Sequence, residues 1–68
     1  MKFDRTEEGF AKAFATATSM ANMHNRSYTV AVFADQPKHY TLSMASLVTK
    51  DSKLAPGTQA MTVNPGES

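Results

Sequence analysis

The strongest strand signal in the chain lies at residues 27–34, which read Ser-Tyr-Thr-Val-Ala-Val-Phe-Ala. The segment is rich in β-branched and aromatic residues, which favour extended structure. Because alternate side chains of a strand point to opposite faces, Tyr28, Val30 and Val32 share one face. The other face is not polar either. A strand that is apolar on both faces is usually covered on both. A single helix can cover only one face, so we expect a second copy or a partner to cover the other.

The residues before this strand, 4–25, carry the periodicity of one amphipathic helix. Their apolar side chains fall within an arc of about 120° when successive residues are placed 100° apart. Asp4 followed by Glu7 resembles a capping box, and Asn25 suits the left-handed conformation that ends many helices. The buried stripe is predicted to contain Phe10, Ala13, Phe14, Ala17, Met20, Ala21 and His24.

The residues after the strand predict a β-hairpin. Residues 35–38, which include a proline, form the turn, and residues 39–45 alternate between apolar and polar side chains. Residues 43–48 suit either a continued, bulged strand or a short helix capped by Ser43, and we favour the strand. Residues 59–63 are compatible with a short third strand on the sheet edge.

These elements predict the α+β class. We expect one N-terminal amphipathic helix packed on an antiparallel β-hairpin or a small three-stranded sheet, in the order αββ or αβββ. Residues 1–63 form a single small domain in this interpretation. Residues 64–68 contain nothing to bury, so we expect a flexible C-terminal tail.

The size and composition of the chain predict a homodimer. The chain has 68 residues and no cysteine, and ten of its hydrophobic residues are alanine. Domains below about 70–80 residues usually depend on disulfides, a metal or a partner subunit. Disulfides are excluded here, and two histidines without a thiolate are a poor basis for a structural zinc site. Self-association through the sheet edge or an uncovered sheet face is therefore expected.

Charge and hydropathy favour neither a membrane nor export. No stretch approaches the roughly 20 apolar residues that span a bilayer, and the mean hydropathy is −0.38. Acidic residues near the N-terminus do not fit a signal peptide, so the cytoplasm is the expected compartment. The formal net charge of +1 gives no overall bias toward an anionic partner.

The chemistry-bearing residues do not form a catalytic pattern. The sequence contains no glycine-rich phosphate loop, no nucleophile elbow and no His-x-x-x-His pair. We therefore expect no enzymatic activity, no cofactor and no metal. The opposing hypothesis, an enzyme that uses His24 or His39, would require a bound metal.

The leading functional prediction is a small, non-enzymatic interaction protein of the adaptor or inhibitor type, with a regulatory role. It would self-associate and bind another protein, because the chain has more apolar surface than its own fold can cover. The predicted partner-binding residues are Met23, Tyr28, Val30, Val32, Tyr40 and Leu42.

The alternative prediction is a small dimeric nucleic-acid-binding regulator. In this hypothesis the basic hairpin region contacts phosphates and tyrosines stack on bases. The residues that would contact nucleic acid are Arg26, Lys38, His39, Lys50 and Lys53.

Overall fold

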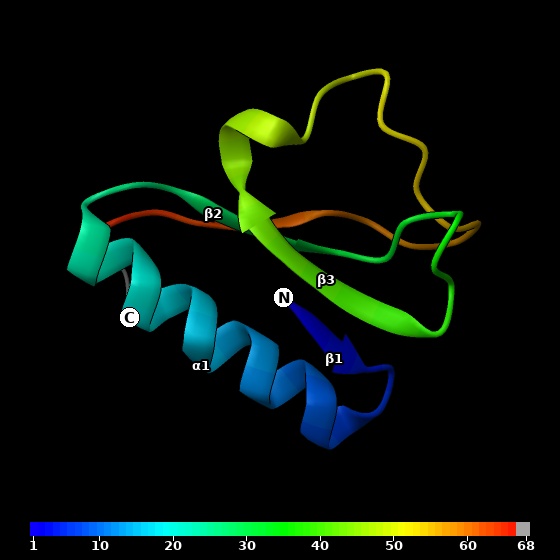
Figure 1. The fold of residues 1–68 in the computed structure, drawn as a ribbon, viewed down its shortest axis with the longest axis horizontal. Helices are drawn as coiled ribbons and strands as arrows, with labels where there is room; N and C mark the ends of the chain where they lie inside the picture. Colours follow the sequence, from blue (N-terminus) through cyan, green and yellow to red (C-terminus); the bar gives the residue numbers. More distant parts are fainter. Residues whose placement is uncertain (67–68) are drawn as a thin grey trace.

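A computed structural model describes residues 1–66 and shows one helix packed along a four-stranded antiparallel sheet (Figure 1). The sheet order is β1-β3-β2-β4, so β1 and β4 are its edges. The predicted α+β class is confirmed, but the expected hairpin or three-stranded sheet is wrong by one strand. The elements are β1 (Lys2–Asp4), α1 (Glu7–His24), β2 (Tyr28–Ala31), β3 (His39–Met44), the 3₁₀ helix η1 (Ala45–Leu47) and β4 (Met61–Val63).

The additional strand is β1, which lies at the N-terminus and pairs with β3. Phe3 lies opposite Tyr40 in this ladder, and Asp4 lies opposite His39. The prediction that Asp4 caps the helix is therefore wrong, because Asp4 belongs to the strand. A strand of three residues is too short to show alternation, and its pairing with distant β3 is invisible in the local sequence.

The helix begins two residues later than predicted. Thr6 is the N-cap, and its Oγ1 accepts a hydrogen bond from the backbone N–H of Gly9 at 3.0 Å. Glu7 and Glu8 place negative charge in the first turn, where the helix dipole is favourable to it.

Thr6→Ala is expected to lower the free energy of unfolding by about 1 kcal/mol, because the N–H of Gly9 loses its side-chain acceptor. Chemical denaturation of the variant and the wild type measures this loss. Thr16→Ala is the matched control, since the Thr16 hydroxyl only donates to the Lys12 carbonyl inside the helix. Equal losses for the two variants would contradict the capping role.

The end of the helix agrees with the sequence prediction. Asn25 adopts the left-handed conformation with φ 52°, and its backbone N–H donates to the carbonyl of Ala21. The N–H of Arg26 donates to the same carbonyl at 3.2 Å. This arrangement satisfies a terminal carbonyl that the helix leaves unpaired.

The helix meets the sheet through its small residues. Ala13, Ala17 and Ala21 are fully buried, whereas Phe14 is 37% exposed and His24 is exposed. The prediction of Phe14 and His24 as members of a buried stripe is therefore wrong. Alanines let the helix backbone lie close to the sheet, and this close approach leaves the large Phe14 at the margin of the contact.

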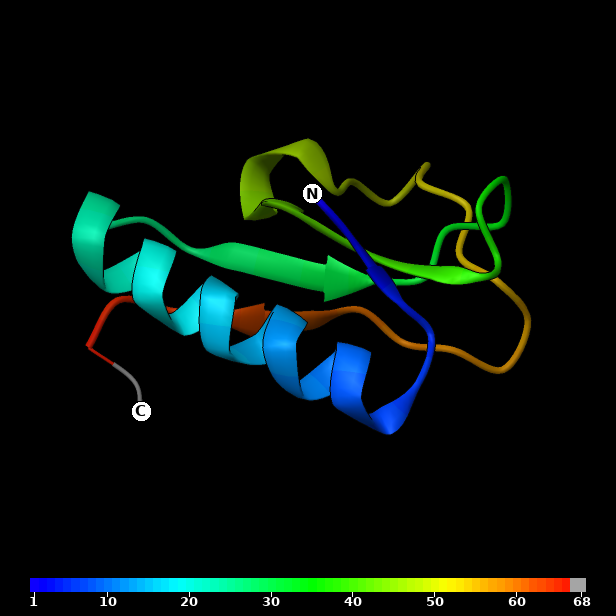
Figure 2. The same cartoon turned by 60° about the horizontal axis from the view of Figure 1, so that its bottom comes forward.

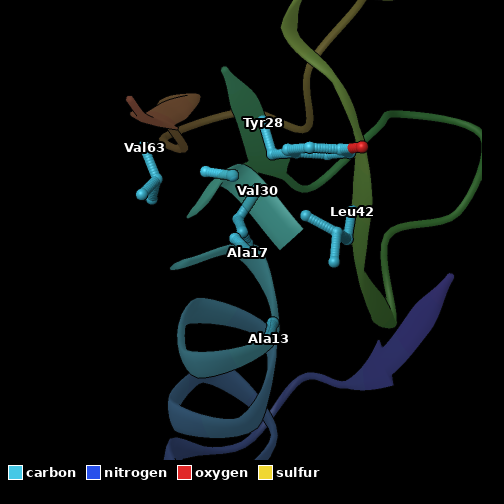
Figure 3. Close-up of a cluster of buried hydrophobic side chains, with 7 residues drawn as sticks. Ala13, Ala17, Tyr28, Val30, Leu42 and Val63 are labelled. Atoms are coloured by element: carbon cyan, nitrogen blue, oxygen red, sulfur yellow. The ribbon is translucent and has the colours of Figure 1, made fainter. Parts of the chain in front are cut away.

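The hydrophobic core lies between α1 and the sheet. Figure 3 shows Leu42 from β3 and Val63 from β4 on either side of Val30, with Ala17 of the helix against Val30. Val30 is only 1% exposed and is the largest fully buried side chain among the described residues. Phe3, Met20, Tyr40 and Met44 pack around this cluster.

Both faces of β2 are buried by the chain itself. All four residues of the strand are buried. Figure 2 shows α1 on one side of the sheet and the segment that contains η1 on the other. This segment, residues 45–60, connects β3 to β4, which flank β2 on opposite sides. The inference that the two apolar faces of residues 27–34 require an external cover is therefore wrong.

The extended path of the central strand continues past β2, but its pairing partner changes. Phe33 forms an isolated antiparallel bridge with Leu54. The carbonyl of Val32 accepts from Ala55 at 2.8 Å, and the N–H of Ala34 donates to Lys53 at 3.0 Å. The returning segment is thus fixed to the end of the strand that it covers.

The two uncertain regions of the second half have different outcomes. The strand favoured for residues 43–48 ends at Met44, and η1 follows it, so the preference for a continued strand is wrong. The third strand expected within residues 59–63 is confirmed as β4, which pairs with β2. In β4, Thr62 lies opposite Thr29, and their hydroxyl oxygens are 3.2 Å apart.

The C-terminal residues contact the helix and the loop before β2. The Ser27 hydroxyl donates to Oδ1 of Asn64 at 2.6 Å, and the N–H of Gly66 donates to Oδ1 of Asn22 at 2.7 Å. Glu67 and Ser68 lie outside the described residues, and the flexible tail at 64–68 stays a prediction. Within residues 1–66, none of the helices combines the length and the hydrophobicity that a membrane span requires.

Candidate functional site

The outer edge of β4 differs in chemistry from the opposite edge of the sheet. At β1 the exposed residues Lys2 and Asp4 are charged. At β4 the exposed residues are Met61 and Thr62, and the sequence contains no charged residue between Lys53 and Glu67. Charged side chains on an edge strand discourage pairing with another chain. The β1 edge has this protection and the β4 edge does not.

A small cavity opens beside β4, between the first turns of α1 and the sheet. Its volume is about 200 Å³. Side chains from α1, β2, β3, β4 and the segments next to them line it, and most of them are apolar. We call it the β4 cavity. Its lining residues are Arg5, Phe10, Val30, Ala31, Val32, Tyr40, Thr58, Gln59 and Met61.

Aromatic side chains extend from the β4 cavity along the helix. The ring of Phe10 lies 5.3 Å from that of Tyr40 and 6.2 Å from that of Phe14, measured between centroids. Phe14 is 37% exposed and Met61 is 39% exposed. Met61 in the lining and Phe14 next to Phe10 are therefore two large apolar side chains that the chain only partly covers.

One cation lies at the cavity, on the segment between β1 and α1. The Arg5 guanidinium donates through Nη1 to the backbone carbonyl of Pro37 at 2.9 Å. This bond connects the start of the helix to the turn before β3. Arg5 is the only charged residue among those that line the cavity in the described part of the chain.

The predicted partner-binding residues separate into two groups. Tyr28, Val30, Val32 and Leu42 are at most 6% exposed, so their side chains are enclosed by the chain itself. Tyr40 is half-buried in the β4 cavity.

Met23 belongs to neither group, since it is 73% exposed and lies away from the cavity. It follows Lys12 by eleven residues, which is close to three helical turns, so the two share a helix face. Lys12 lines a hollow against β1, on the far side of the helix from β4.

The predicted nucleic-acid-binding cations lie in three separate parts of the fold. Arg26 lies within 3.6 Å of the Met44 sulfur at the end of β3. Lys38 and His39 lie at the start of β3. The length of this strand separates them from Met44 by about 17 Å. Lys50 and Lys53 belong to the segment that returns to β4, where Lys53 lines a shallow hollow of about 510 Å³ together with Lys2 and Asp35.

The two histidines are also separated. The His24 ring lies 6.3 Å from the ring of Tyr28 at one end of the sheet, and His39 lies opposite Asp4 at the other end. Among residues 1–66, no group of three or more histidine and acidic side chains is placed to hold a metal ion. The metal-dependent hypothesis for His24 and His39 gains no geometric support from their positions.

Phe10 and Met61 line the site and Phe14 lies against Phe10, although the sequence patterns predict none of the three as binding residues. The helical spacing of both phenylalanines predicts them in a buried stripe. The signal that could have found this region is the uncharged stretch 54–66, which is unusual for an exposed edge. It was visible in the sequence, but only the sheet order shows that it forms an edge.

The fold and this site define a small α+β protein with an uncharged sheet edge beside an apolar cavity. In comparisons with known proteins, no family model, curated protein or solved structure matches the chain.

Proposed function

We propose that this chain is a small non-enzymatic interaction protein of the adaptor or inhibitor type, which binds an extended segment of another protein at β4. The observation that carries this proposal is the outer edge of β4, which lies next to the β4 cavity. This strand pairs with β2 on one side only and carries no charged residue. An extended segment can add to such an edge through backbone hydrogen bonds, while pockets for alternate side chains give specificity.

The cavity limits the chemistry of the segment. A volume of about 200 Å³ accepts one medium or large apolar side chain, and Phe10, Tyr40 and Met61 supply the contacts. The lining contains no acid and no histidine among the described residues, so binding rather than proton transfer is the chemistry it supports. A regulatory role and a cytoplasmic location remain predictions from the sequence.

Met61→Lys is expected to abolish the binding of such segments, because a cation replaces an apolar wall of the cavity. The test selects binding peptides from a displayed random library with the wild-type chain and measures their affinity for each variant. Amide chemical shifts of the wild type should change at residues 58–63 on addition of a selected peptide. At least a tenfold loss of affinity is expected, which corresponds to about 1.4 kcal/mol.

Met23→Lys is the matched control, since the same replacement is made at an exposed methionine on the helix face away from β4. It should leave the affinity unchanged. The proposal fails if Met61→Lys binds as tightly as the wild type while remaining folded. It also fails if the shifted amides cluster around Lys50 and Lys53, because the peptide would then bind away from β4.

A further inference from the structure

We propose that the β4 edge also binds a second copy of this chain, by antiparallel pairing of the two β4 strands with Thr62 on a two-fold axis. The two sheets would then join into one continuous sheet with both helices on the same side. This inference rests on the proposed function, because it names a partner for the same edge.

The charge distribution favours a second copy at this edge. In a two-fold pairing of antiparallel strands the residue on the axis faces its own copy, so a charged residue at that position would repel itself. The exposed side chains of β4, Met61 and Thr62, are neutral, and the nearest charged residue on the N-terminal side is Lys53. The other edge, β1, carries the exposed charges of Lys2 and Asp4, which lose water in any pairing even though a two-fold axis through Phe3 would place them opposite each other.

The symmetry of antiparallel pairing needs only one surface patch. A two-fold axis makes the interface self-complementary, because each residue faces its symmetric counterpart. With Thr62 on the axis, Thr62 lies opposite Thr62 of the second copy. Met61 then lies opposite Val63 of the second copy, so that apolar side chains meet on the helix side of the sheet.

The partly exposed side chains lie where this second copy would cover them. Met61 points to the same face as Val63, which packs under α1. Phe14 is in ring contact with Phe10, and Phe10 and Met61 line the same cavity. A second copy next to β4 therefore removes further surface of both Met61 and Phe14 from water.

The length of β4 limits the strength of the dimer. The strand has three residues, and the helix margin adds only Phe14 to the contact, so the interface is smaller than that of a permanent dimer. We expect an equilibrium between monomer and dimer that shifts with concentration. Sedimentation velocity from micromolar to millimolar concentration should show the mass rising from one chain toward two.

Charge substitutions at Thr62 test both the edge and the register. Thr62 is exposed, but its hydroxyl oxygen lies 3.2 Å from that of the buried Thr29, so Lys or Asp removes this contact, and circular dichroism establishes that each variant is folded. Thr62→Lys and Thr62→Asp should each remain monomeric, because like charges directly opposite each other destabilise a strand pair. An equimolar mixture of the two variants should restore the dimer, since a lysine then faces an aspartate. Thr62→Val keeps the β-branched shape and should dimerise as the wild type does.

Three results would overturn the inference. These are a wild type that stays monomeric at millimolar concentration, a Thr62→Lys variant that still dimerises, and a mixture that fails to restore the dimer. Peptide selection against the wild type separates this failure from that of the proposed function. A monomer that binds selected peptides at residues 58–63 refutes only the dimer, and a dimer without peptide binding refutes only the binding of other proteins.

Discussion

Val30→Asp is expected to leave the protein largely unfolded at room temperature. Val30 is 1% exposed, lies between Leu42 and Val63, and contacts the helix where the alanines approach the sheet (Figure 3). The substitution removes the burial of a valine, worth about 1.5 kcal/mol or more, and buries a carboxyl group without a partner, which costs several kcal/mol more. A chain of this length has a total stability of about 3–10 kcal/mol, so the loss is comparable to the whole.

Circular dichroism and thermal unfolding measure this result, and Phe14→Asp is its control. The sequence pattern predicts burial for Phe14, but its 37% exposure in the structure leaves room for a hydrated carboxylate. Phe14→Asp should therefore unfold cooperatively, with a loss of about 1–2 kcal/mol. A cooperative transition for Val30→Asp near the wild-type midpoint would show that the core does not depend on Val30.

Gly9→Ala is expected to destabilise the protein, although alanine usually stabilises a helix. In an unconstrained helix the replacement gains about 1 kcal/mol. Here a Cβ on Gly9 would overlap the carbonyl oxygen of Asp4 and lie 2.8 Å from its carbonyl carbon. Asp4 cannot easily retreat, because β1 is paired with β3 and its carbonyl accepts a hydrogen bond from Thr6 at 2.9 Å.

The conflict between the Gly9 Cβ and the Asp4 backbone should cost about 2–3 kcal/mol, as overpacking of a fixed site does. In a domain of this size, such a loss lowers the midpoint of thermal unfolding by about 10–20 °C. Hydrogen exchange should show reduced protection in Lys2–Asp4, because β1 is the element that has to move. Ala15→Gly, at an exposed helix position, calibrates the ordinary difference between the two residues. An increase in the midpoint for Gly9→Ala would contradict the close packing of β1 on α1.

Local sequence patterns are strongest where many residues share one periodicity. The long helix and its end at Asn25 were predicted because eighteen helical residues repeat one spacing and the cap residue has a specific conformation. The pairing of residues 28–31 with the segment 39–44 follows from two apolar runs separated by a proline turn. The strand β4 was expected for the same reason, although more weakly.

Elements that depend on distant partners were predicted poorly. Lys2–Asp4 forms a strand because it pairs with β3. Strand β3 ends at Met44, and from there the chain crosses the sheet toward β4. The candidate site depends on distant partners in the same way. Residues from α1, β2, β3 and β4 line the β4 cavity, and their spacing in the sequence does not show that they meet.

Composition and periodicity alone therefore established a small α+β chain without cysteine, with one amphipathic helix before an antiparallel strand pair. The order of the strands, the cover over both faces of β2 and the position of the neutral stretch at an open edge came from the folded chain. The physical reason is that periodicity indicates which side chains are favourable to bury. Pairing and packing between residues far apart in the sequence decide which of these side chains are buried. In this protein the expected binding surface therefore changes from the central strand β2, which the chain encloses, to β4, the uncharged edge of the sheet.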